Sequence, residues 1–243
     1  MSVEIQVGLI LLLSSFTFAF SGFGFSLVSV PLLVLVLPLK TAVAFQFPYA
    51  LILVTWHAWH YRGFVTRREL WPIMTGALVA MPLGAWLLYA APEHLLKRAL
   101  AIFIVLSVLG LALPAGRRLG RLCAGKVWWG LLWGFLSGSF QGAYSTGGPP
   151  AVIYIMASDP EPRRAMGFLG AFFSFLYLVM TMIYAASGLF TLEVMTQSAL
   201  YAPVVAAGTL AGALLFRRAN SRTYRQAVHG LLLLTAVLLW LGR

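Results

Sequence analysis

Charged residues are scarce in this sequence: Lys, Arg, Asp and Glu together make up 9% of its 243 residues. A soluble domain carries about 25% charged residues. Hydrophobic residues reach 61%, and they gather in long runs. Several runs approach or exceed the roughly 20 residues that span a bilayer. The composition excludes an ordinary soluble domain and predicts an all-α polytopic membrane protein, with the lipid bilayer as its surroundings.

Acidic residues are especially few, with 6 Asp and Glu against 17 Lys and Arg. A carrier of cations or protons usually keeps a carboxylate inside the membrane. Here every acidic residue lies at the end of an apolar segment, which argues against metal-cation transport and favours an anionic or neutral substrate. The formal net charge of +11 would suggest nucleic acid in a soluble protein. In a membrane protein such positive charges orient the helices, so we expect no nucleic-acid partner.

Cysteine and catalytic groupings are missing as well. The single cysteine, Cys123, cannot form an intramolecular disulfide, and one thiol does not make a metal site. No serine has a histidine and a carboxylate near it in the sequence, and no paired carboxylates face one cavity. We therefore expect a protein that is not an enzyme and that has neither a metal nor a cofactor.

Eight apolar segments remain between the clusters of proline, glycine and charge. They are residues 3–37, 41–61, 71–90, 95–113, 127–158, 164–186, 194–216 and 225–241. No linker between them is long enough to separate soluble domains. We expect a single membrane domain, 1–243.

Glycine-rich breaks interrupt two of these segments at matching places in the two halves of the chain. Lipid cannot hydrogen-bond a bare backbone, so irregular backbone at membrane depth survives only inside protein or along a polar cavity. Paired breaks in two half-repeats indicate the substrate site of a transporter. The candidate binding residues are Ser21, Gly22, Gly24 and Ser26 in the first break, and Gln141, Tyr144, Ser145, Thr146, Gly147, Gly148 and Pro149 in the second.

The second break has the chemistry of an anion site. A helix that restarts there exposes backbone N–H groups and the positive end of its dipole. Pro149 suits the first turn, where its missing N–H costs nothing, and Gly147 and Gly148 let the backbone approach a ligand closely. The hydroxyl and amide side chains add donors. Alternatively, the glycines serve only tight helix packing and the hydroxyls bond back to their own helix.

Other polar residues lie in the second segment, 41–61. Gln46 is well inside it, and it either makes an interhelical hydrogen bond or is a further substrate-binding residue. His57 and His60 lie at its end, where an interfacial belt explains them. A histidine that titrates near neutrality would alternatively serve a proton-coupled step.

The two halves resemble each other, with repeat one at 1–115 and repeat two at 126–243. Ser21-Gly22 aligns with Ser137-Gly138, or alternatively with Gly142, and Gly84 aligns with Gly212. If all eight segments cross the membrane, the 17 Lys and Arg divide 8 to 9 between its two sides. If each broken segment is a re-entrant hairpin, they divide 13 to 4. The second division is the one that the positive-inside rule expects.

We therefore predict two inverted repeats, each a re-entrant broken helical hairpin plus three transmembrane helices. Three spans are an odd number, so the second repeat is inverted relative to the first. Both termini then face outside, and the two hairpin tips can meet near the midplane of the membrane.

Two stretches carry a family resemblance. Residues 22–33 form a glycine-rich motif that ends in Val30-Pro31 and Leu32-Leu33, and residues 134–138 continue to Gly147-Gly148-Pro149-Pro150. They resemble the TauE/SafE family of membrane proteins, the sulfite exporter or sulfonate-related anion transporter group. Phe25 and Ser26 stand where that family often has glycine.

The resemblance implies a secondary transporter of small sulfur-containing anions, such as sulfite or organosulfonates. From the broken helices themselves we expect the substrate to be held at the midplane by their N-termini, and the negative interior of the cell favours export across the bacterial inner membrane. Two other readings stay open: a non-transporting membrane scaffold or assembly protein, and a passive anion channel. Association into a homo-oligomer is left open too.

Overall fold

A computed structural model describes residues 2–21, 24–64, 67–112, 125–156 and 161–216, with residues 233, 236, 237 and 239–241 near the C-terminus. Within these ranges the regular structure is helical throughout, which confirms the expected all-α class. Gly22 and almost all of the expected eighth segment, 225–241, lie outside the described residues. So do many of the loop arginines used in the charge count, and the resulting topology stays a prediction.

Three of the described helices are long and apolar enough to cross a membrane: α3 (Leu39–His60), α4 (Arg67–Ala90) and α9 (Pro162–Ala186). Each corresponds to one of the expected spans. Another expected span, 95–113, forms the helix α5 (Glu93–Ala112), which is not among these three. A further candidate span is a pair of consecutive helices, α10 (Leu192–Ala199) and α11 (Ala202–Phe216).

The α10–α11 pair corrects the expectation of one continuous segment over 194–216, because its two helices meet at a bend of 48°. Pro203 has no N–H to offer the carbonyl of Ala199, which ends the regular hydrogen bonding there. The carbonyl of Ser198 instead accepts the N–H of Tyr201 at 2.9 Å. It also accepts the hydroxyl of Tyr49, which reaches it from α3.

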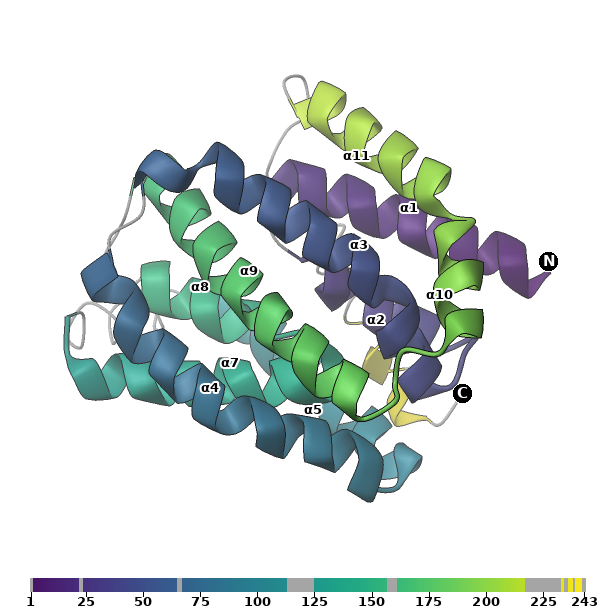
Figure 1. Ribbon diagram of the computed structural model, residues 1–243, viewed down its shortest axis with the longest axis horizontal. Coiled ribbons are helices and arrows are strands. Elements are labelled where there is room, and N and C mark those ends of the chain that lie inside the picture. The colour runs from purple at the N-terminus through teal and green to yellow at the C-terminus, as the bar shows by residue number, and fades with distance from the viewer. Residues whose placement is uncertain are drawn as a thin grey trace. The chain divides into compact units, whose positions relative to one another are not determined.

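The described chain forms two compact units, and each is considered by itself. Unit 1 comprises Met1–Ala50, Ala91–Val108 and Gly188–Arg243, and unit 2 comprises Leu51–Ala90 and Leu109–Ser187. In unit 1, α1 (Val3–Ser21) lies beside α11 (Figure 1). A Cβ atom at Gly208 would lie 2.6 Å from the carbonyl oxygen of Leu12, and one at Gly212 would lie 2.6 Å from that of Phe16. The two glycines therefore let the backbones of α1 and α11 touch.

Unit 2 repeats this kind of packing between α4 and α7 (Val127–Tyr144). A Cβ atom at Gly138 would lie 2.6 Å from Cα of Ala77, and one at Gly142 would lie 2.8 Å from the backbone nitrogen of Ala85. Further glycines on the two helices are equally confined: Gly76, Gly84 and Gly134. Small residues that recur every four positions let membrane helices approach closely, and here they join α4 to α7 along most of their length.

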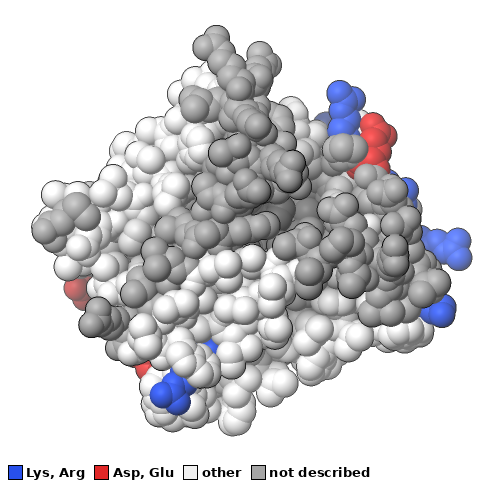
Figure 2. Space-filling view, turned by 180° about the vertical axis from the view of Figure 1, so that it is seen from behind, with Lys and Arg blue, Asp and Glu red and all other residues white. Residues whose placement is uncertain are grey.

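Few of the described side chains on the face in Figure 2 are charged. The side chains at the end of α3 include exposed Trp56 and Trp59, with the guanidinium of Arg62 4.0 Å from the ring centroid of Trp59. His57 is buried and His60 is exposed. The exposed tryptophans are consistent with an interfacial belt at this end of α3, while the burial of His57 is not explained by one, and the belt stays a prediction.

Candidate functional site

Both expected breaks are present as interruptions between helices. α1 ends at Ser21 and α2 (Phe25–Leu33) follows, while α7 ends at Tyr144 and α8 (Gly148–Met156) follows. The helix ends before the breaks, Ser21 and Tyr144, are 123 residues apart, and so are the helix starts after them, Phe25 and Gly148. The helices after the breaks have nine residues each, about 13 Å, against the roughly 30 Å of a hydrocarbon core.

Ser137-Gly138 and the alternative partner of Ser21-Gly22, Gly142, all lie within α7, before the second break. The alignment of Ser21-Gly22 with these residues stays a prediction. Gly138 has a different task, because it packs against Ala77 of α4. The glycines before the second break therefore divide into packing residues and residues of the break itself.

The second break forms a hairpin in which α8 returns along α7. The hydroxyl of Ser137 donates to the carbonyl oxygen of Gly147 at 2.7 Å. A Cβ atom at Gly130 would lie 3.3 Å from the hydroxyl of Tyr154. The start of α8 thus lies beside the second half of α7, and its end lies beside the beginning of α7. The two helices run antiparallel.

Ser145 turns the chain at the tip of this hairpin. Its φ of 56° and ψ of 28° place it in the left-handed region, where a residue with a side chain is uncommon. Its N–H donates to the carbonyl of Gln141 at 2.8 Å, which is the hydrogen bond of a left-handed helix cap. Such a conformation costs about 1 kcal/mol or more, so neighbouring contacts have to hold it.

Two tyrosines of α9 supply these contacts. The hydroxyl of Tyr177 accepts from Ser145 Oγ at 3.1 Å and donates to the Ser145 carbonyl at 3.0 Å. Two turns further along the same face of α9, the hydroxyl of Tyr184 donates to the carbonyl of Gly142 at 2.7 Å. Sequence reasoning missed both. Their signal was a pair of tyrosines seven residues apart, and therefore on one face of a mainly apolar helix.

Tyr177→Phe is expected to lower the free energy of unfolding by about 1–2 kcal/mol, because the carbonyl and hydroxyl of buried Ser145 lose their partner. Thermal unfolding of the purified protein measures this. Tyr89→Phe is the matched control, since Tyr89 bonds Ser187 in an exposed position. An equal loss in both variants would contradict a special role of Tyr177 at the break.

Gln141 is the most unusual polar residue of the site. It is fully buried, and its Oε1 accepts the N–H of Gly147 at 3.0 Å, which fixes the orientation of the amide. Its Nε2 has no hydrogen-bond partner among the described residues. A buried donor without an acceptor costs about 1–3 kcal/mol and calls for an explanation. A bound ligand with an acceptor oxygen would supply one.

The other predicted groups of the second break are mostly engaged within it. Thr146 Oγ1 donates to the carbonyl of Tyr144 at 2.8 Å. A Cβ atom at Gly147 would lie 2.6 Å from the carbonyl oxygen of Ser137. Pro149 and Pro150 carry no N–H, so Gly148 offers the backbone donor of the first helical positions. Of residues 141–150, all within the described ranges, Gly148 alone is half-buried and the others are buried.

The first break is built differently. Gly24 has a φ of 94°, which favours glycine, and α2 starts directly after it. Ser26 Oγ donates to Oε1 of Gln46 at 2.8 Å, and Ser29 Oγ lies 3.5 Å from the same oxygen. Gln46 thus makes an interhelical hydrogen bond, which is one of the two roles expected for it. The first turn of α2 contains no proline and keeps its N–H groups. Ser21 ends α1, and its side chain lies outside the description.

A family model described as "Sulfite exporter TauE/SafE" matches residues 7–239. The match includes both breaks and nearly the whole chain. No curated protein and no solved structure matches it.

Proposed function

Since the chain belongs to the sulfite exporter TauE/SafE family, we propose that it is a secondary transporter that exports small sulfur-containing anions across the inner membrane of a bacterium. It is an integral membrane protein of a transporter family. The finer proposal concerns the substrate class, sulfite or an organosulfonate, and its binding at the broken helices.

The observation that carries the proposal is the unpaired Nε2 of Gln141 beside the start of α8. A sulfite or sulfonate group offers acceptor oxygens and a negative charge. Gln141 Nε2 would donate to one oxygen, and the N–H of Gly148 would donate to another. The positive end of the α8 dipole favours the charge, and it requires no ionised side chain in the membrane.

The breaks differ in how they would hold an anion. At the start of α8 the two prolines remove backbone donors, so the side-chain amide of Gln141 and the N–H of Gly148 would donate the hydrogen bonds to the anion. In α2 the N–H groups of Phe25 and Leu27 remain, and the side chains of Ser26 and Gln46 bond each other. We propose that the α8 break recognises an anion through Gln141, whereas the α2 break by itself would offer an anion mainly backbone donors.

We also propose that the two halves are inverted repeats. The constant separation of 123 residues supports equivalent breaks. Gly84 packs against α7 and Gly212 packs against α1, as expected if these two glycines correspond. Alternating exposure of the site would then carry the anion across. The interior of the cell is negative, which favours outward movement of an anion by about 2.3 kcal/mol per charge and 100 mV.

A thermal-shift panel on the purified protein tests this function. Sulfite, thiosulfate and methanesulfonate are compared with chloride at equal ionic strength. A ligand present at 100 times its Kd should stabilise the protein by about 2.7 kcal/mol. No anion-dependent shift would favour the scaffold reading. In proteoliposomes, flux that saturates with sulfite concentration supports a carrier, whereas flux that never saturates supports a channel.

A further inference from the structure

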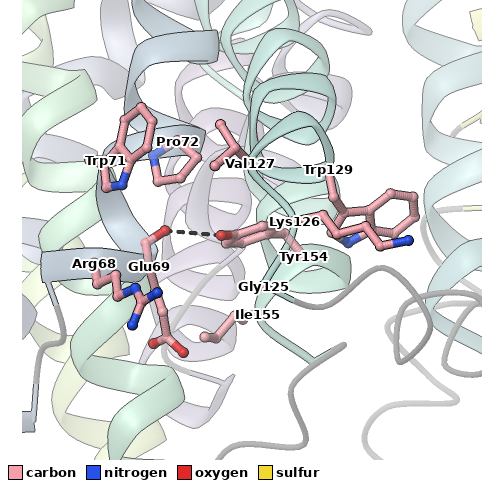
Figure 3. A pocket seen from close by; sticks show the side chains of 10 residues that line it. All are labelled: Arg68, Glu69, Trp71, Pro72, Gly125, Lys126, Val127, Trp129, Tyr154 and Ile155. Atoms are coloured by element: carbon pink, nitrogen blue, oxygen red, sulfur yellow. Dashed lines mark hydrogen bonds between the residues drawn. The ribbon is translucent and has the colours of Figure 1, made fainter.

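Unit 2 contains a pocket of about 400 Å³ at the far end of the α7–α8 hairpin from the break. α4 and α7 begin at this pocket and α8 ends there, as Figure 3 shows. α7 has 18 residues, so the pocket lies about 27 Å along the helix from Ser145. It is therefore separate from the proposed substrate site.

The lining of the pocket carries an excess of positive charge. Arg68 from α4 and Lys126 at the start of α7 both line it, and both are exposed. Glu69 is the acidic residue among the described lining residues, and its carboxylate is ion-paired with Arg164. The N-terminus of α7 adds the positive end of a helix dipole, and no side chain caps it.

Two buried polar atoms of the lining residues have no partner among the described residues. Trp129 is 4% exposed, and its indole Nε1 is an unpaired donor. Oε2 of Glu69 is an unpaired acceptor. The hydroxyl of Tyr154 is already engaged, because it donates to the backbone carbonyl of Glu69 at 3.0 Å (Figure 3). A ligand that satisfies this lining needs anionic acceptor oxygens and also a hydroxyl donor.

We propose that this pocket binds the phosphate group of an anionic phospholipid headgroup of the phosphatidylglycerol type. Its phosphate oxygens accept from Lys126, Arg68 and the Trp129 indole. A glycerol hydroxyl donates to Oε2 of Glu69. Basic pockets between membrane helices bind such headgroups.

The flanking tryptophans favour a lipid over a free ion. Trp71, which lines the pocket, is 50% exposed, and Trp128 beside Lys126 is 51% exposed. Tryptophan is enriched at the level of lipid headgroups, where its ring meets acyl chains and its N–H meets water. A soluble phosphate ion would gain nothing from these two exposed rings.

The experiment measures thermal stabilisation of the purified full chain by three probes: phosphatidylglycerol, phosphatidylcholine and inorganic phosphate. We expect a clear shift with phosphatidylglycerol and a much smaller one with phosphatidylcholine, which lacks the hydroxyl and the net charge. Lys126→Gln and Arg68→Gln should each weaken the apparent lipid affinity roughly fivefold, the effect of one cation near a lipid surface. Trp129→Phe keeps the ring and removes the donor, and should also weaken it.

Lys40→Gln is the matched control, because Lys40 is an exposed lysine of unit 1 that does not line the pocket. It should leave the lipid affinity unchanged. Equal stabilisation by both lipids, or wild-type affinity in the Lys126→Gln/Arg68→Gln double variant, would overturn the proposal. A shift with inorganic phosphate alone, lost in that double variant, would keep the phosphate site and overturn the lipid as its source.

Discussion

Replacing Gly138 with alanine is expected to lower the thermal midpoint of the purified protein by about 6–12 °C. The added methyl group would lie 2.6 Å from Cα of Ala77 and closer still to its carbonyl oxygen. These are backbone atoms, so no side-chain rotation relieves the clash, and the helices α4 and α7 have to separate. Overpacking of this kind costs about 3 kcal/mol, and each kcal/mol moves the midpoint of a chain this long by about 2–4 °C.

Gly8→Ala is the control for that substitution. Gly8 is a helical glycine of α1, and the nearest atom to a Cβ there is Cε1 of Tyr201 at 3.6 Å, an ordinary contact. Alanine favours a helix over glycine by about 1 kcal/mol, so this variant should be unchanged or slightly more stable. Similar losses in the two variants would contradict the close contact of α4 and α7.

Two substitutions of Gln141 should separate its role in the fold from its role in binding. Gln141→Leu removes both the acceptor for the Gly147 N–H and the free donor. It should therefore cost about 1–2 kcal/mol of stability and also abolish stabilisation by sulfonate. Gln141→Glu keeps an acceptor for Gly147 but replaces the donor by a carboxylate oxygen. It should retain more of the stability and still lose the sulfonate effect, by roughly 100-fold in affinity, because like charges repel.

The measurement is the midpoint shift against methanesulfonate concentration at constant ionic strength. Gln197→Glu is the control, because Gln197 is exposed on α10 and bonds Glu193. It should bind as the wild type does. A sulfonate shift that survives Gln141→Glu would remove Nε2 from the list of ligand groups, even if the wild type proves to be a transporter.

The positions of the two breaks could be predicted because glycine, serine and proline gather there between long apolar runs. The role of each glycine could not be predicted, since Gly138 and Gly142 look in the sequence like parts of the second break. Whether a glycine serves a turn or a close helix contact depends on the partner helix, and the residues of α4 that Gly138 and Gly142 contact lie more than 50 residues earlier in the chain.

The residue at the tip of the second hairpin was also beyond local reasoning. A left-handed residue is usually glycine, and at the first break it is Gly24. At the second break it is Ser145, held by Tyr177 from 32 residues further along. The bend at α10–α11, by contrast, had a local signal in Pro203. The hydroxyl that Tyr49 supplies to the carbonyl of Ser198 at this bend comes from about 150 residues earlier and had no such local signal.

The contact between α4 and α7 has a mechanical consequence. Where peptide groups of two helices touch at Gly134, Gly138 and Gly142, a slip of one residue would drive side chains into spaces that hold only hydrogen atoms. Packed interiors switch between discrete arrangements and do not deform continuously. The helices α4 and α7 therefore behave as one rigid unit. A displacement that opens the tip at Ser145 therefore requires the end of α7 to bend or to separate from α4. It cannot come from sliding of α7 along α4.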